Sequence, residues 1–226
     1  HVRSRRQRQM CIRDRSRGGL PEIFLENVDF EKYADFVMDY PILFLKKDDK
    51  YLSGKNYKFS DYMNGNIQEI NKSLPSIDDL GLHLSTIFTE NRLKQYIELR
   101  SMDTCGWNCI CAGPAFFTGL LYGNLDEALE FISKWEKKDL LNAYKDAPMK
   151  GLDTNLMGKD MIYWISNLLK IAEKGLEKRD FIGKSGTNET KYLEHLNKII
   201  NNKETVASHV INKFSKFQNL EDLYDK

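Results

Sequence analysis

The sequence predicts an α+β fold in which a few short strands precede a long run of helices. Up to about residue 102, short apolar runs alternate with turn residues. Beyond Pro114, apolar side chains recur at helical spacing almost to the end of the chain. Hydrophobic residues make up 41% of the 226 residues, which is enough for a packed core. A chain of this length holds one domain or two small ones.

The first elements alternate between helix and strand. Asp29 is a suitable N-cap for a helix over Phe30–Tyr40, and Pro41 stands just past its end. A strand is expected over Ile42–Lys46, and a short return strand begins after the polar turn at residues 47–50. These elements predict a helix followed by a hairpin.

Two further helices and a strand complete the first half. Ser60 is expected to cap a short helix that Gly65 interrupts. Ser76 is expected to cap a helix running from Ile77 toward Phe88, and a strand over Lys94–Met102 follows.

The second half is predicted to be helical. Pro114 suits the first turn of a helix, and Asn124 with Glu127 forms an approximate capping box. A stripe of apolar residues at helical spacing predicts one long amphipathic helix. The expected helices cover Ala115–Tyr122, Asn124–Lys138, Lys159–Arg179, Glu189–Asn201 and Glu204–Phe217.

The net charge of +1 conceals a basic N-terminal segment. Residues 1–17 contain seven of the ten arginines and one aspartate, a charge of +6, whereas the rest carries 27 basic and 32 acidic side chains. We therefore interpret residues 1–18 as a non-native or disordered basic segment that resembles translated sequencing-adapter read-through. The alternative is a basic arm that binds RNA or DNA. The mildly acidic remainder is not expected to bind nucleic acid.

The apolar runs and the cysteines bear on where the protein is located in the cell. The longest apolar stretch, Cys109–Tyr122, is interrupted by Gly and Pro and is too short for a membrane span. Cys105, Cys109 and Cys111 form C-x3-C-x-C, which fits neither a zinc nor an iron–sulfur spacing and favours buried thiols or a redox pair. With no signal-peptide pattern, we expect a cytoplasmic protein.

The strand at residues 95–102 carries the candidate chemistry. Because side chains alternate along a strand, Ile97 and Leu99 are expected to face the core, and Tyr96, Glu98 and Arg100 the opposite side. Two residues apart on one face is about 6.7 Å. Glu98 could hold a metal ion there and Arg100 an anionic substrate. The alternative is a cross-strand salt-bridge ladder on a solvated face.

The use of arginine favours a functional site. Outside the first 17 residues the chain has 24 lysines but only Arg92, Arg100 and Arg179. Arginine presents a planar fork that lysine cannot imitate. Since Arg92 and Arg100 flank one strand, both are predicted to grip a planar group. The helix dipole explains Arg179 adequately, because it ends a predicted helix.

This segment resembles a known family. Residues 90–103 read E-N-R-L-K-Q-Y-I-E-L-R-S-M-D, and the likeness continues through Trp107, Cys111, residues 114–116 and residues 119–122. The stretch resembles glutamate–cysteine ligases of the type shared by plants and many proteobacteria, which show E-V-R-L-K-x-Y-L-E-M-R-G-A-D. His83 matches a family histidine, and a packed or surface histidine is an equally good interpretation of it.

The resemblance implies the first step of glutathione biosynthesis. ATP would phosphorylate the γ-carboxylate of L-glutamate, and the amine of L-cysteine would attack the acyl phosphate, with Mg²⁺ bridging the phosphates. By similarity, Glu98 would be a magnesium ligand. Arg100 would be the catalytic contact to glutamate or the phosphoryl group, and Arg92 a supporting substrate contact. The nucleotide-binding residues are not identified. The implied fold is an antiparallel sheet with packed helices, like the glutamine-synthetase superfold.

Departures from the family pattern suggest an incomplete enzyme. Thr104-Cys105 replaces a glycine pair, and Asn108-Cys109 replaces two basic residues. Because family members are considerably longer, residues 19–226 are interpreted as the C-terminal part of the catalytic domain, truncated on the N-terminal side. Such a fragment could be inactive alone. A related carboxylate–amine ligase and a non-catalytic binding fragment are the alternatives.

Overall fold

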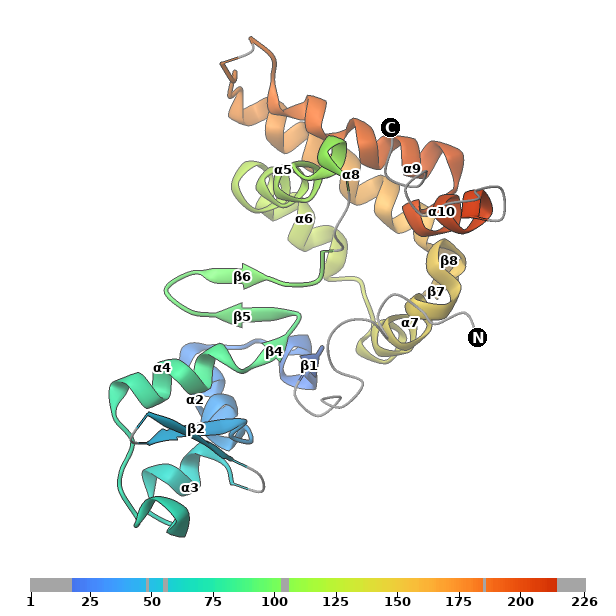
Figure 1. Cartoon of the computed structure of the whole chain (residues 1–226). Helices are drawn as coiled ribbons and strands as arrows, with labels where there is room; N and C mark the ends of the chain where they lie inside the picture. Colours follow the sequence, from blue (N-terminus) through green and yellow to red (C-terminus); the bar gives the residue numbers. More distant parts are fainter. Residues whose placement is uncertain (1–17, 48, 55–56, 103–105, 185, 215–226) are drawn as a thin grey trace. The chain divides into compact units, whose positions relative to one another are not determined.

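A computed structural model describes residues 18–47, 49–54, 57–102, 106–184 and 186–214. The chain divides into two units, unit 1 up to Met102 and unit 2 from residue 103 onward (Figure 1). Helices and short strands occur together, which confirms the α+β prediction. The predictions for residues 1–17 and for the Thr104-Cys105 departure lie outside the described residues.

Unit 1 alternates short helices with short strands. Its elements are β1 (Gly18–Gly19), the 3-10 helix η1 (Glu22–Leu25), α2 (Phe30–Asp39), β2 (Phe44–Lys47), β3 (Lys50–Ser53), α3 (Phe59–Met63), the 3-10 helix η2 (Gln68–Ile70), α4 (Ile77–Ser85), β4 (Phe88–Thr89), β5 (Asn91–Leu93) and β6 (Ile97–Leu99).

The strands pair two by two. β2–β3 and β5–β6 are antiparallel, β1 and β4 are parallel, and the fourth pair is β7–β8 in unit 2. The expected single antiparallel sheet is therefore not found among the described residues. The strands contain only two to four residues each, fewer than the roughly five or six of an ordinary strand, and no pair is extended by a third strand in the described part of the chain.

The helix caps of unit 1 are only partly as predicted. The Asp29 carboxylate accepts a hydrogen bond from the Lys32 amide at 2.8 Å, and Ser76 caps α4 as expected. Ser60, however, lies inside α3, which begins at Phe59 with Lys58 at the N-cap position, two residues earlier than predicted. The α4 helix ends at Ser85 and does not reach Phe88, because the chain enters β4.

Two apolar clusters form the core of unit 1. The first surrounds the β2–β3 hairpin and includes the fully buried Phe59, Ile67 and Ile70. The second joins α2 to the end of α4 through Val37 and Ile87. Together they fix α2 and α4 beside the β5–β6 hairpin.

Unit 2 is mainly helical. Its elements are the 3-10 helix η3 (Trp107–Cys109), α5 (Ala112–Thr118), the π-helical segment η4 (Gly119–Gly123), α6 (Leu125–Ile132), α7 (Lys137–Lys150), the 3-10 helix η5 (Gly151–Asp153), β7 (Asn155–Leu156), β8 (Lys159–Asp160), α8 (Met161–Arg179), the 3-10 helix η6 (Glu189–Leu193), α9 (Glu194–Asn202) and α10 (Val206–Phe214).

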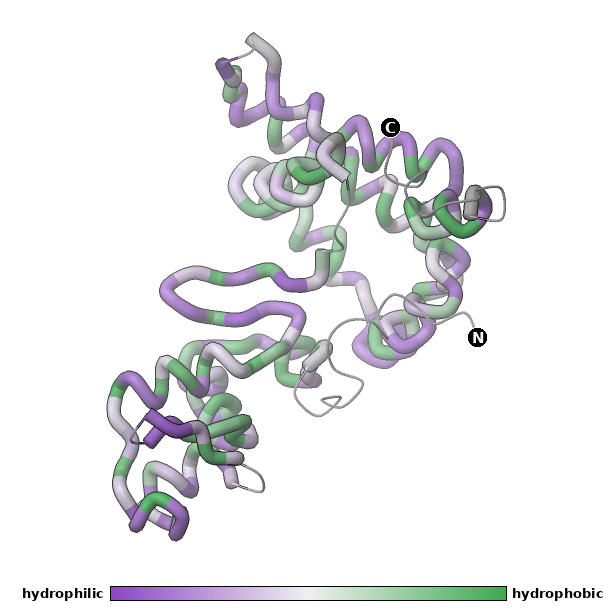
Figure 2. Tube along the Cα trace, in the orientation of Figure 1, coloured by the Kyte–Doolittle hydropathy of each residue, from purple (hydrophilic) through white to green (hydrophobic). Residues whose placement is uncertain are grey.

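The long helix α8 organises unit 2. Asp160 caps it, with its carboxylate 2.8 Å from the Tyr163 amide, and hydrophobic and hydrophilic residues alternate along the helix (Figure 2). It packs closely against η4, because a Cβ atom added at Gly175 would lie 2.0 Å from the Gly119 carbonyl oxygen. Only glycine permits this backbone approach.

The predicted helix from Asn124 to Lys138 is too long. It ends at Ile132, and α7 begins separately at Lys137. Between them Trp135 packs edge-on against Trp164 of α8, with ring centroids 5.7 Å apart, so tertiary packing overrides the helical periodicity. No described helix is both long and apolar enough to cross a membrane.

Candidate functional site

The candidate site lies on the β5–β6 hairpin of unit 1. The predicted strand over Lys94–Met102 is in fact the turn and second strand of this hairpin. The chain reverses at Lys94-Gln95-Tyr96, where the Lys94 amide donates to the Tyr96 carbonyl at 2.8 Å. The antiparallel register places Arg92 directly opposite Glu98. Directly paired side chains project from the same face, close enough to interact.

Arg92 is buried, and all three of its guanidinium nitrogens contact oxygen atoms of the protein. Its side chain is 7% exposed. The Nε and Nη2 atoms lie 2.8 and 2.6 Å from Glu98 Oε2. Nη1 donates to the carbonyl oxygens of Ser85 and Ile87, which satisfies a carbonyl at the C-terminus of α4.

Arg100 approaches the other oxygen of the same carboxylate. Its Nη1 atom donates to Glu98 Oε1 at 3.2 Å, and both side chains are just over a quarter exposed. The guanidinium lies over the Phe88 ring, 5.5 Å from the ring centroid. The Arg100 amide donates to the Glu90 carbonyl, which anchors the strand end. Glu98 therefore lies between two guanidinium groups.

The electrostatics of Glu98 favour its ionised form. Burial raises the pKa of this carboxyl, but the hydrogen bond from Arg92 and the charges of Arg92, Arg100 and Lys94 outweigh burial. The pKa of Glu98 is thus below its ordinary value of 4.5. The carboxylate is available as an acceptor or ligand at neutral pH.

The structure brings all three predicted site residues together, with differences in detail. Glu98 and Arg100 contact each other directly, where the strand spacing suggested a bound group between them. Tyr96 lies in the turn and not on the strand face. Ile97, expected in the core, is 69% exposed, because it follows the turn at the tip of the hairpin. The Arg92–Glu98 contact is a cross-strand ion pair, as in the salt-bridge alternative, but Arg92 is 7% exposed and does not lie on a solvated face.

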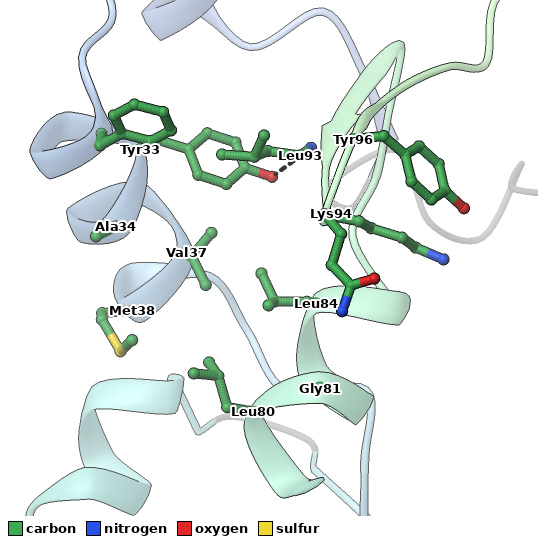
Figure 3. A pocket seen from close by; sticks show the side chains of 12 residues that line it. Tyr33, Ala34, Val37, Met38, Leu80, Gly81, Leu84, Leu93, Lys94 and Tyr96 are labelled. Atoms are coloured by element: carbon green, nitrogen blue, oxygen red, sulfur yellow. Dashed lines mark hydrogen bonds between the residues drawn. The ribbon is translucent and has the colours of Figure 1, made fainter. Parts of the chain in front are cut away.

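An apolar groove borders the hairpin turn. It has a volume of about 680 Å³ and lies between α2, α4 and the turn (Figure 3). The Tyr33 hydroxyl accepts a hydrogen bond from the Leu93 amide at 3.1 Å, which fastens β5 to α2. The edge of the groove is lined by Lys94, Gln95 and Tyr96. Sequence reasoning missed this groove, because its walls come from elements far apart in the chain.

His83 is a packed core residue. It is 3% exposed, its Nε2 atom lies 2.9 Å from the Val37 carbonyl oxygen, and its ring stacks on Phe59 at 4.6 Å. This environment matches the packed interpretation and assigns no chemistry to the ring.

The described residues offer little for a metal held by protein alone. No cluster of three or more His, Cys, Asp or Glu side chains occurs among them. Cys109 is disulfide-bonded, Cys111 carries an exposed free thiol, and Cys105 lies outside the described residues. A single carboxylate such as that of Glu98 is compatible with Mg²⁺. This ion commonly takes one or two carboxylates and completes its shell with water and substrate phosphates.

Sequence reasoning missed three partners of the two arginines. The Ser85 and Ile87 carbonyls are backbone groups, so no side-chain signal announces them. Phe88 of β4 lies beside Arg100 although the two residues are twelve positions apart in the chain. Sequence spacing alone carries no information on such contacts.

The fold and this cluster define an α+β protein with a half-buried carboxylate held between two guanidinium groups. This chemistry suits anionic groups and the cations that accompany them. The model of glutamate-cysteine ligase family 2 (GCS2) matches residues 3–219, and the chain belongs to this family.

Relatives in plants are similar over most of this chain. It is 34% identical over 203 residues to the chloroplastic glutamate–cysteine ligase of Solanum lycopersicum, covering 88% of this chain and 37% of that protein. The chloroplastic ligase of Nicotiana tabacum is 32% identical over 201 residues, 88% of this chain and 37% of its own length. The chloroplastic ligase of Arabidopsis thaliana is 31% identical over 205 residues, which cover 89% of this chain and 38% of that protein. The chain thus spans well under half of these relatives.

The prediction of a cytoplasmic protein is wrong. These relatives are named as chloroplastic proteins, which points to a plastid. The prediction rested on the missing signal-peptide pattern in residues 1–17, and a chain spanning 37% of a relative is no guide to the leader of the whole protein.

Proposed function

We propose that this chain is part of an enzyme that joins the γ-carboxylate of L-glutamate to the amine of L-cysteine. ATP would first convert the carboxylate into an acyl phosphate, which the amine then attacks. Family membership supports this proposal most strongly, together with the names of the relatives. Residues 19–226 would form the C-terminal part of a glutamine-synthetase-like catalytic domain, whereas the match to the family model begins earlier, at residue 3.

The hairpin supplies groups suited to this chemistry. We assign Glu98 as a ligand of Mg²⁺, which when bound would neutralise phosphate charge. Arg100 would contact the glutamate carboxylate or the phosphoryl group, because its contact with Glu98 uses only one of five N–H donors. A half-buried guanidinium beside a carboxylate is well placed to stabilise charge that develops during phosphoryl transfer. A substrate contact by Arg92 stays a prediction.

The test is ATP- and Mg²⁺-dependent formation of γ-glutamylcysteine. This chain would replace the matching segment of the tomato relative, and the product would be detected by mass spectrometry. We expect product from the chimera and a loss of kcat of at least about 100-fold with Arg100→Lys, because lysine cannot reproduce the planar fork. Glu98→Gln should abolish turnover. Arg179→Lys, which alters an arginine–glutamate pair in unit 2, is the matched control.

The outcomes separate the candidate functions. Near-normal turnover by Arg100→Lys would remove the role assigned to Arg100. No γ-glutamylcysteine from a folded chimera, but ADP release with another amine, would favour a related carboxylate–amine ligase. No nucleotide turnover from a folded chimera would favour a non-catalytic binding fragment.

A further inference from the structure

We propose that Arg92 is a positioning residue, which fixes the Glu98 carboxylate so that Oε1 is the oxygen available to a divalent cation. The inference rests on the proposed function, in which Glu98 is a magnesium ligand. It gives Arg92 a different role from the substrate contact that the sequence predicts.

The contacts of Arg92 are directed into the protein. Nε and Nη2 face Glu98 Oε2, and both hydrogens of Nη1 are matched by the carbonyl oxygens of Ser85 and Ile87. These four contacts occupy four of the five N–H donors of the guanidinium. With 7% of its side chain exposed, Arg92 has little surface left for a substrate.

The two oxygens of Glu98 are consequently not equivalent. A carboxylate oxygen offers two lone-pair positions. Two nitrogens of Arg92 use both positions of Oε2, at 2.8 and 2.6 Å, whereas Oε1 has the single 3.2 Å contact with Arg100. A cation bound by Glu98 would therefore bind through Oε1, with one oxygen and not two.

The anchor of Arg92 makes this arrangement rigid. Its carbonyl partners belong to the end of α4 and the segment after it, and Ile87 is fully buried. Arg92 thus couples the carboxylate orientation to the core of unit 1. Partners that orient a metal ligand commonly change metal affinity 10- to 100-fold when they are altered.

The test is a double-mutant cycle on Mn²⁺ binding by the 226-residue chain in the presence of ATP and L-glutamate, because phosphate oxygens are needed to complete the shell of the cation. Mn²⁺ accepts the same oxygen ligands as Mg²⁺ and can be followed by electron paramagnetic resonance. We expect Arg92→Lys to raise the Mn²⁺ Kd about 10-fold. In a Glu98→Gln background the same substitution should change nothing further, because Arg92 acts through Glu98. Arg179→Lys is the matched control, and circular dichroism verifies folding.

Each outcome decides between the two proposals. A Glu98-dependent Mn²⁺ Kd that Arg92→Lys leaves unchanged, or changes equally in both backgrounds, overturns the positioning role and leaves the proposed function standing. Equal Mn²⁺ binding by the wild-type and Glu98→Gln chains, including none by either, overturns the metal role of Glu98 and the inference with it.

A measurement on the wild-type chain covers the case in which Arg92→Lys does not fold. Arginine Nε–H signals are followed by ¹⁵N nuclear magnetic resonance while Mg²⁺ with ATP, and then L-glutamate, are added. We expect the Arg92 signal to stay in place and that of Arg100 to move. Movement of the Arg92 signal on addition of glutamate would overturn the inference in favour of a direct substrate contact.

Discussion

In unit 2 two backbones meet at Gly119 and Gly175 without any side chain between them, whereas in unit 1 a buried guanidinium fills the space between α4 and the hairpin. The contact between Gly119 and Gly175 requires that neither residue has a side chain. The contact of Arg92 requires that its N–H groups point at their acceptors. Packing of the first kind tolerates no added volume, and packing of the second kind tolerates no lost donor. The candidate chemistry lies in the unit that depends on polar contacts.

The largest effect is expected from added volume in unit 2. In Gly175→Ala the new methyl group would lie 2.0 Å from the Gly119 carbonyl oxygen, so α8 and η4 must separate. We expect a loss of about 3 kcal/mol in the free energy of unfolding. Because all three tryptophans lie beyond residue 103, urea unfolding followed by tryptophan fluorescence reports on unit 2.

The matched control is Gly81→Ala in α4 of unit 1, which is followed by amide hydrogen exchange because unit 1 contains no tryptophan. A Cβ atom there would meet no atom within 4 Å, and alanine is the better helix former by about 0.5–1 kcal/mol. We expect this variant to be slightly stabilised. Similar destabilisation by both alanines would show that the close approach of Gly175 to Gly119 is not the cause of the loss, because Gly81 has no such neighbour.

The next effect is expected from a lost donor in unit 1. Arg92→Met removes one of the two arginine partners of Glu98 and the partner of the Ser85 carbonyl, while keeping an apolar side chain of similar length. We expect a loss of about 2 kcal/mol, below the value for a fully buried pair because Glu98 is 29% exposed. Amide hydrogen exchange at the buried Ile87 measures this loss of stability within unit 1.

Arg179→Met is the control for Arg92→Met. The Arg179–Glu189 pair in unit 2 has a separation of 3.4 Å, and the Arg179 side chain is 32% exposed whereas that of Arg92 is 7% exposed. Exposed pairs contribute at most about 1 kcal/mol. If both methionine variants lost equal stability, the buried carbonyl contacts of Arg92 would have no measurable value, and the contrast between the units would fail.

The position of the long helix in unit 2 could be predicted because local signals suffice for it. The α8 helix was expected over Lys159–Arg179 and covers Met161–Arg179, since Asp160 caps it and its apolar residues recur at helical spacing. In unit 1 the Asp29 and Ser76 caps were predicted for the same reason. The ends of a long periodic helix can be predicted from its own sequence when polar residues cap it.

The hairpin could not be predicted in the same way. Its turn, Lys94-Gln95-Tyr96, contains no glycine, proline, asparagine or aspartate, the residues that usually announce a turn. Without the turn, Arg92 and Glu98 appear six residues apart along the chain, and their pairing is invisible. The residue types of the candidate site were accessible from the sequence, but their register and their carbonyl partners were not.

A smaller effect concerns pH. The pKa of Glu98 in the folded chain is below its ordinary value of 4.5, because Arg92, Arg100 and Lys94 together outweigh burial. A carboxyl with a lowered folded pKa adds stability above its unfolded pKa, and that stability is lost as the pH falls through the folded pKa. We therefore expect the wild type to lose more stability than Glu98→Gln below roughly pH 4.5, measured by hydrogen exchange in unit 1. Parallel pH profiles would contradict this.

The smallest effect is expected at an exposed pair in unit 2. The Lys174 ammonium lies 2.8 Å from Glu127 Oε1, and Asn124 donates to Oε2 at 2.6 Å. The hydrogen bonds from Lys174 and Asn124 also lower the pKa of Glu127. Both charged side chains are exposed, however, and water and salt screen the pair.

Lys174→Met should therefore change the unfolding free energy of unit 2 much less than Arg92→Met changes that of unit 1. The small difference should vanish in about 1 M NaCl, where the screening length falls to about 3 Å. Tryptophan fluorescence in urea, with and without salt, measures both values. A loss as large as that of Arg92→Met would mean that a short ion-pair distance is sufficient for stability. A salt-insensitive loss would point instead to the packing of the lysine stem on α6. Only the expected small, salt-sensitive loss would show that burial of the guanidinium, and not the pairing of charges, distinguishes the site in unit 1.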